Sequence, residues 1–272
     1  MKIDSSSVKS LIRRKNDNVK SKAEELEEFR DTKYIFHSIS HPGKVRENNE
    51  DSLLISESSF LSKDKETSTI FAAIADGLGG MKDGEKASYM AVTRSYAYFV
   101  ENLSFVLDGI SYDKVLMKAL NRANNSINES NEKKDKENHM ASTLTLVVIS
   151  GSQGYFVHSG DCSIIKVNAK IEYLNKSHRM PKTNQIYSCL GVGKDVEVDT
   201  GIFQMSEGDS IVICSDGLTD MVPDNEIKSI VNGQKANPDK VCNSLVDEAL
   251  NRGGRDNISI IDVYCKRVVS SS

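Results

Sequence analysis

Four aspartates that lie far apart in the chain each stand beside an apolar run that predicts a β-strand. They are Asp51, Asp76, Asp216 and Asp256. A carboxylate at the end of a strand is held by a rigid scaffold and still reaches solvent. Oxygen ligands of this kind suit hard cations such as Mg²⁺ or Mn²⁺. The arrangement indicates one metal site assembled from both halves of the chain, which requires the sequence between them to fold as one cooperative unit.

Composition sets the boundaries of that unit. Residues 1–33 are rich in Ser, Lys, Asn and Glu and have few apolar side chains, so they are predicted to form a mobile polar tail. A short helix over residues 21–29 is an alternative there, with its charges on a solvated face. Residues 34–266 are predicted to form the folded domain, and residues 267–272 a short C-terminal tail.

Hydrophobic periodicity predicts two groups of strands, each followed by helices. In the first group, residues 34–39, 52–55 and 69–75 read as consecutive antiparallel strands, followed by amphipathic helices over 84–102 and 111–129. The second group has predicted strands at 142–149, 154–158, 163–167, 171–174, 196–203 and 210–214, then helices from Pro223 and Pro238 and a closing strand at 258–264.

Strands in meanders with helices in pairs favour an α+β fold over a doubly wound parallel sheet. The simplest way to cover every apolar stripe is a four-layer αββα sandwich, in which two packed antiparallel sheets are flanked by helix pairs.

Charge and cysteine content exclude several classes of protein. With 35 basic and 39 acidic residues the net charge is −4, so no nucleic-acid surface is expected. The five cysteines are scattered without a Cys-x-x-Cys pair, which favours a reduced, cytoplasmic protein. No apolar run is long enough for a signal peptide or a membrane span, so neither secretion nor a membrane partner is expected.

Asp-Gly occurs at residues 76–77 and 216–217, where the common interpretation is a hairpin turn. Neither dipeptide leads into a second strand, so a turn that exposes a carboxylate explains both better. The glycine-rich run at 79–84 lacks the Lys and Ser/Thr of a Walker A loop. Arg46, close to Glu50 and Asp51, is either part of a surface ion-pair cluster or a forked clamp for phosphate.

Together these motifs resemble the PP2C-type (PPM) metal-dependent protein serine/threonine phosphatases in their bacterial form. The resemblance covers about residues 34–265, in the order of the family. It is carried by His41-Pro42-Gly43-Lys44-Val45-Arg46-Glu47-Asn48-Asn49-Glu50-Asp51, Asp76-Gly77-Leu78-Gly79-Gly80, Gly84-Glu85-Lys86-Ala87-Ser88, Met140-Ala141-Ser142-Thr143, Ser159-Gly160-Asp161-Cys162-Ser163, Cys214-Ser215-Asp216-Gly217-Leu218 and Gly253-Gly254-Arg255-Asp256-Asn257-Ile258-Ser259.

The resemblance implies a role for each residue of the site. Asp76 would bridge two Mg²⁺ or Mn²⁺ ions, Asp216 and Asp256 would bind the first ion, and the Gly77 carbonyl would bind the second. Glu50 and Asp51 would hold metal-bound waters, and Arg46 would bind the phosphate. A hydroxide that bridges the ions would then attack phosphorus in line, without a phospho-enzyme.

Three features depart from the family pattern. Leu78 stands where animal members carry a histidine, so no general acid is evident; His178 reads as structural and His41 as a surface residue. Asp135 and Glu137 both lie near the usual place of a third-metal ligand. Only eleven residues separate His178 from Leu190, so the flap found there in relatives must be much reduced, which predicts a more open site.

The resemblance therefore implies a protein phosphatase that hydrolyses phosphoserine and phosphothreonine. It would act as a monomer on phosphorylated proteins and oppose a cognate kinase. A weakly active or inactive binding module with the same fold is the first alternative. Inactive relatives typically lose metal aspartates, and Asp76, Asp216 and Asp256 are all present in this chain. A phosphatase for small phosphorylated molecules is the second.

Overall fold

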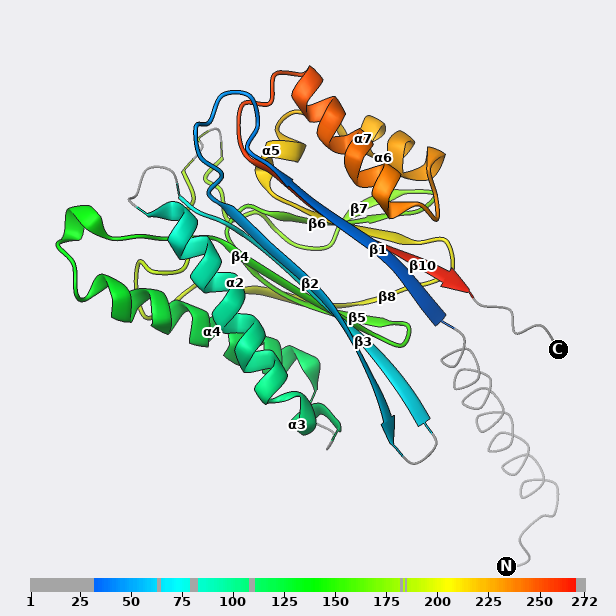
Figure 1. Cartoon of the computed structure of the whole chain (residues 1–272), viewed down its shortest axis with the longest axis horizontal. Helices are drawn as coiled ribbons and strands as arrows, with labels where there is room; N and C mark the ends of the chain where they lie inside the picture. The colour runs from blue at the N-terminus through cyan, green and yellow to red at the C-terminus, as the bar shows by residue number, and fades with distance from the viewer. Residues whose placement is uncertain are drawn as a thin grey trace, which may run out of the picture.

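A computed structural model describes residues 32–62, 65–78, 83–107, 111–181, 183 and 185–267. The predicted helix over 21–29 and nearly all of both predicted tails lie outside these residues. Figure 1 shows two sheets in the middle of the molecule, with one group of helices on each outer side. The four-layer αββα sandwich predicted from the sequence is confirmed.

Both sheets have five strands, and every neighbouring pair is antiparallel. The first sheet has the order β1 (Thr32–His41), β10 (Ile258–Arg267), β9 (Ser210–Cys214), β6 (Ser163–Val167) and β7 (Ile171–Tyr173). The second has the order β2 (Asp51–Ser62), β3 (Lys65–Asp76), β4 (Leu144–Ser150), β5 (Gln153–Ser159) and β8 (Asp199–Gln204).

One pairing expected from the sequence is wrong. The strands at 34–39 and 52–55 were expected to be neighbours, but β1 pairs with β10, from the far end of the chain, and β2 pairs with β3. Residues 42–50 carry the chain from one sheet to the other. Alternation of apolar and polar residues predicts a strand and its buried face, but it does not identify the neighbouring strand.

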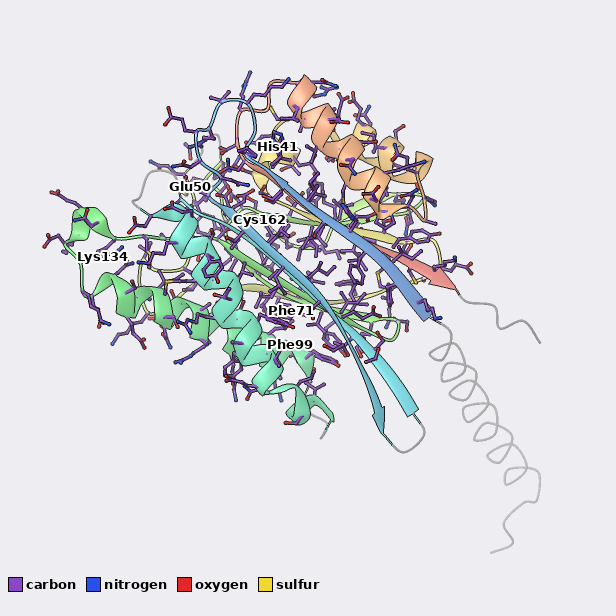
Figure 2. The ribbon with its side chains drawn as sticks, in the orientation of Figure 1. His41, Glu50, Phe71, Phe99, Lys134 and Cys162 are labelled. Carbon is purple, nitrogen blue, oxygen red and sulfur yellow. The ribbon has the colours of Figure 1, made fainter. Side chains whose placement is uncertain are left out.

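Helices cover each sheet through a separate apolar cluster. On the second sheet lie α2 (Gly84–Glu101), α3 (Leu103–Leu107) and α4 (Tyr112–Asn131), with Phe71 and Phe99 buried between α2 and the strands (Figure 2). On the first sheet lie α5 (Asp216–Thr219), α6 (Asp224–Gly233) and α7 (Pro238–Asn251). A third cluster fills the space between the sheets, and it includes Ile74, Ile149, Ile213 and Ile261.

The short elements α3, α5 and the 3₁₀ turn η1 (Lys136–Asn138) were not predicted, since three to five residues carry too little periodicity to reveal a helix. Among the residues described, no helix combines the length and apolar character needed to cross a membrane.

Candidate metal centre

Asp51, Asp76, Asp216 and Asp256 lie at or beside strand ends, as the sequence predicts. Asp51 begins β2 and Asp76 ends β3, and the two residues are directly opposite each other in the antiparallel register. Asp216 follows β9 and begins α5, while Asp256 lies just before β10. Both sheets therefore direct carboxylates toward one end of the sandwich.

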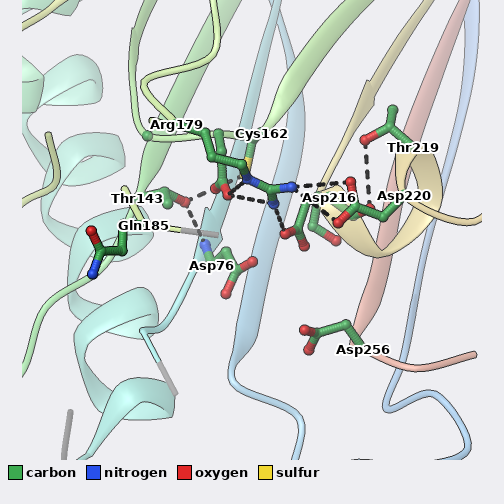
Figure 3. Close-up of polar contacts among 12 residues, drawn as sticks. Asp76, Thr143, Cys162, Arg179, Gln185, Asp216, Thr219, Asp220 and Asp256 are labelled. Atoms are coloured by element: carbon green, nitrogen blue, oxygen red, sulfur yellow. Dashed lines mark hydrogen bonds and ion pairs between the residues drawn. The ribbon is translucent and has the colours of Figure 1, made fainter. Parts of the chain in front are cut away.

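The closest grouping includes an aspartate for which no role was predicted. Asp76, Asp161 and Asp216 each place a carboxylate oxygen so that the three atoms lie within 4.8 Å of one another. Asp161 follows β5, in a motif used above only as a sign of resemblance, and it is 5% exposed. Asp256 stands apart from this group in Figure 3 and accepts a 2.7 Å hydrogen bond from Nη2 of Arg46.

Hydrogen bonds hold the backbone of Asp76 in place. Its N–H donates to Oγ1 of Thr143 at 2.8 Å, and its carbonyl accepts from the N–H of Thr143 at 2.8 Å and from Oγ of Ser142 at 2.9 Å. The Met-Ala-Ser-Thr step that Thr143 ends was quoted as a motif, but its task became visible only in the structure. A carboxylate anchored in this way has a fixed position before any ion arrives.

The glycines after Asp76 and Asp216 are required by close packing. A Cβ on Gly77 would overlap the carbonyl oxygen of Gly84, and one on Gly217 would overlap that of Asn257. Gly77 forms a bridge with Ser142 and Gly217 lies in α5, so neither dipeptide makes a hairpin turn. The structure thus excludes the hairpin interpretation of the Asp-Gly pairs.

Asn257 ties the loop between β1 and β2 to the C-terminal half of the site. Its Oδ1 accepts from the N–H of Glu50 at 2.8 Å, and its Nδ2 donates to the carbonyls of Pro42 and Asn48, both at 2.9 Å. The Glu50 carboxylate faces Gly84 at the start of α2, where a Cβ would come within 2.8 Å of Oε1. Asn257 therefore fixes the backbone of Glu50, the residue before Asp51.

The electrostatics of the cluster fit divalent cations. Burial, followed by the charges of neighbouring carboxylates, raises the pKa of Asp76 and of Asp216. Burial also raises the pKa of Asp51, against hydrogen bonds from Ser259 and Ser215 that favour its charged form. Oδ1 of Asp51, Asp161 and Asp216 is in each case buried without a hydrogen-bond partner. Crowded carboxylates with unpartnered oxygens are the donor set that Mg²⁺ or Mn²⁺ would complete.

A single arginine lies against the cluster, and sequence reasoning missed it. Arg179 donates from Nη2 to Oδ2 of Asp161 at 2.8 Å and to Oδ2 of Asp216, and from Nη1 to both oxygens of Asp220 at 3.1 and 3.0 Å (Figure 3). Burial opposes its charge, but the hydrogen bond to Asp161 and the charge of Asp216 outweigh burial and raise the pKa of Arg179. A lone arginine after a histidine gave no signal in the sequence.

The residues around Arg179 form a short antiparallel bridge in the segment where the sequence predicts a reduced flap. Arg179 and Ile186 make an isolated antiparallel bridge, flanked by hydrogen bonds from the N–H of Met180 to the Gln185 carbonyl and from that of Tyr187 to the His178 carbonyl. His178 is 3% exposed, and its Nδ1 accepts from the N–H of Gly160 at 3.3 Å. This burial agrees with the structural role predicted for His178.

The acidic cluster of Asp76, Asp161 and Asp216 does not include the predicted third-metal candidates, Asp135 and Glu137. Both are exposed, at the start of and within η1, and neither joins a group of three potential ligands among the described residues. Neighbouring Lys134 forms an ion pair with Asp83 at 2.6 Å, on the side of α4 seen at the left of Figure 2.

Comparison with known proteins places this geometry in context. The family described as "Protein phosphatase 2C" matches residues 45–252. The serine/threonine phosphatase stp of Listeria monocytogenes is 28% identical over 238 residues, which cover 80% of this chain and 91% of that protein. The protein phosphatase PhpP of Streptococcus pneumoniae is 28% identical over 207 residues, 69% of this chain and 82% of its own.

Solved structures agree in fold. The serine/threonine phosphatase of S. agalactiae superposes with a TM-score of 0.70 at 28% identity, over 85% of this chain and 99% of that one. The catalytic domain of the phosphatase PstP, solved with 2 manganese ions, superposes with a TM-score of 0.67 at 24% identity, over 86% of this chain and 99% of its own.

Proposed function

The chain belongs to the protein phosphatase 2C family and is a metal-dependent serine/threonine protein phosphatase, and we propose which of its residues hold the ions and the phosphate. Asp76, Asp216 and Asp256 would be the direct ligands, with the Gly77 carbonyl beside them. Glu50 and Asp51 would orient water around the ions. The observation that carries this proposal is the cluster of Asp76, Asp161 and Asp216, whose ligand atoms lie within 4.8 Å of one another.

The donor set matches the ions that it would hold. All the proposed ligand atoms are oxygens, and hard divalent cations such as Mg²⁺ and Mn²⁺ prefer oxygen. When bound, two such ions would neutralise phosphate charge and make water a better nucleophile at neutral pH. The protein would contribute a fixed backbone position for two of these acids, through Thr143 at Asp76 and Asn257 at Glu50.

Arg46 would bind the phosphoryl group of the substrate. Its side chain is 43% exposed and touches Asp256 through Nη2 alone. A guanidinium has five N–H donors in a planar fork, so donors remain for two phosphoryl oxygens. The contact with Asp256 would hold the fork at the edge of the centre and lower the entropy lost on substrate binding.

The substrate class follows from the family, and the partners are a further proposal. Phosphoserine and phosphothreonine in proteins would be the substrates, and a cytoplasmic serine/threonine kinase would supply them. The enzyme would act as a monomer. A short flap would leave the site more open, so small phosphorylated molecules are a second candidate class of substrate.

Hydrolysis of a phosphothreonine peptide, with Mn²⁺ and with a chelator, tests the proposal in wild type and in Asp76→Asn, Asp216→Asn and Asp256→Asn. We expect activity that needs the metal and falls at least about a hundredfold in each variant. Glu172→Gln, on exposed β7, serves as a matched control and should retain wild-type activity. Full wild-type activity in chelator, or full activity in Asp76→Asn, would refute the assignment.

A further inference from the structure

Arg179 occupies a position that three carboxylates would otherwise offer to a cation. Asp161, Asp216 and Asp220 surround its guanidinium, which uses Nε, Nη1 and Nη2 to reach them. Asp216 and Asp161 also belong to the acidic cluster with Asp76. Arg179 therefore contacts the acidic cluster through Asp161 and Asp216, on the side that faces Asp220.

The two oxygens of each shared carboxylate are used differently. In Asp161 and Asp216, Oδ2 accepts from Arg179, while Oδ1 is buried and has no hydrogen-bond partner. One oxygen of each residue is thus neutralised by the arginine, and the other remains available to an ion that Asp76 also binds. Arg179 and a metal ion on the Asp76 side need not compete for the same atoms.

The backbone holds Arg179 firmly on both sides. The N–H of His178 donates to the Gly160 carbonyl at 2.6 Å, and the N–H of Met180 donates to the Gln185 carbonyl at 2.8 Å. The side chain is only 20% exposed. An arginine fixed in this way loses little further entropy when it forms its hydrogen bonds, so its charge is a permanent part of the centre.

We propose that Arg179 is a built-in cation that takes the place of a divalent ion between Asp161, Asp216 and Asp220. The inference rests on the proposed metal centre and deepens it: wild type would bind its ions on the side of Asp76 and Asp256 only. A further divalent ion would then have no place among Asp161, Asp216 and Asp220 unless Arg179 is removed.

Counting bound Mn²⁺ tests this, by equilibrium dialysis with the free ion measured by electron paramagnetic resonance. Arg179→Ala should bind about one Mn²⁺ more per chain than wild type, because three carboxylates lose their countercharge and can hold a hard cation instead. Arg179→Lys keeps a positive charge and should match wild type. Arg252→Ala removes an exposed arginine that also bridges two acids, Glu226 and Glu248, and should match wild type too.

A second variant checks where the additional ion binds. Asp220→Asn in the Arg179→Ala background should remove the gained ion and leave the others. Equal Mn²⁺ counts in wild type and folded Arg179→Ala would overturn the inference, and so would a gained ion that survives Asp220→Asn. If Arg179→Ala does not fold, Arg179→Gln replaces it in the same comparison.

The proposed centre can fail separately from this inference. Wild type that binds no Mn²⁺, or binds as many ions as Asp76→Asn does, contradicts the centre itself. Wild type that binds Mn²⁺ through Asp76, with no gain in Arg179→Ala, contradicts only the role of Arg179.

Discussion

Replacing the buried carboxylate Asp262 with asparagine should stabilise the protein at neutral and alkaline pH. Asp262 lies in β10 opposite Val212 of β9 and is fully buried. Burial raises the pKa of Asp262 from its ordinary 3.8 to about 7. Each pH unit between these two pKa values lowers the free energy of unfolding by about 1.4 kcal/mol. Ionising Asp262 in the folded protein therefore costs about 4 kcal/mol in total.

The sign of the pH dependence follows from the raised pKa. Between pH 3.8 and about 7 the folded state holds a proton that the unfolded state has lost, so stability falls as pH rises through this window. Above about pH 7 both states are ionised and the loss is complete. Asparagine has nearly the same shape and cannot ionise, so Asp262→Asn should escape this loss.

Urea unfolding at pH 5 and pH 8 measures the effect. The free energy of unfolding of Asp262→Asn, relative to wild type, should increase by about 3 kcal/mol from pH 5 to pH 8, since two pH units of the window lie above pH 5. The acidic cluster titrates in both proteins and cancels in this difference. Parallel curves for wild type and variant over this range would refute the reasoning, and Glu172→Gln should give such parallel curves.

Three further predictions concern the site and its support. Arg46→Ala should raise KM for a phosphothreonine peptide roughly tenfold or more. Arg46→Lys should give a KM between those of Arg46→Ala and wild type, because one ammonium replaces a forked pair of donors. Equal KM values for wild type and Arg46→Ala in steady-state kinetics would contradict this role. Gly77→Ala should lower the free energy of unfolding by about 1–3 kcal/mol, because its Cβ overlaps the Gly84 carbonyl. Gly233→Ala, whose Cβ would meet no atom within 4 Å, is the control. Equal urea midpoints for wild type and Gly77→Ala would count against the close approach. Burial lowers the pKa of His158 to about 4, so the contribution of neutral His158 to stability is complete above about pH 6.5 and is lost as pH falls toward 4. The free energy of unfolding of His158→Gln, measured in urea, should therefore lack about 3 kcal/mol of this pH dependence. The same pH profile in wild type and variant would contradict the prediction.

Much of the site was predictable because its residues lie at strand ends. An apolar run followed by Asp and Gly marks a carboxylate on a rigid element, and the structure brings Asp76 and Asp216 together as predicted. The predicted ligand Asp256 lies nearby but accepts a hydrogen bond from Arg46, and the predicted acids Asp135 and Glu137 lie at the start of and within η1, outside the cluster. Spacing along the chain indicates which residues can be ligands, but the distances between them depend on how the two sheets are stacked.

Most of the elements, their buried faces and the family could be predicted from local patterns, because periodicity, glycine positions and motif order are local properties. Three outcomes became visible only in the folded chain: β1 pairs with β10 instead of β2, Asp161 joins the acidic cluster, and Arg179 neutralises one side of that cluster. These outcomes depend on contacts between residues far apart in the chain. Such contacts are selected by the packing of whole layers, and no local pattern records them.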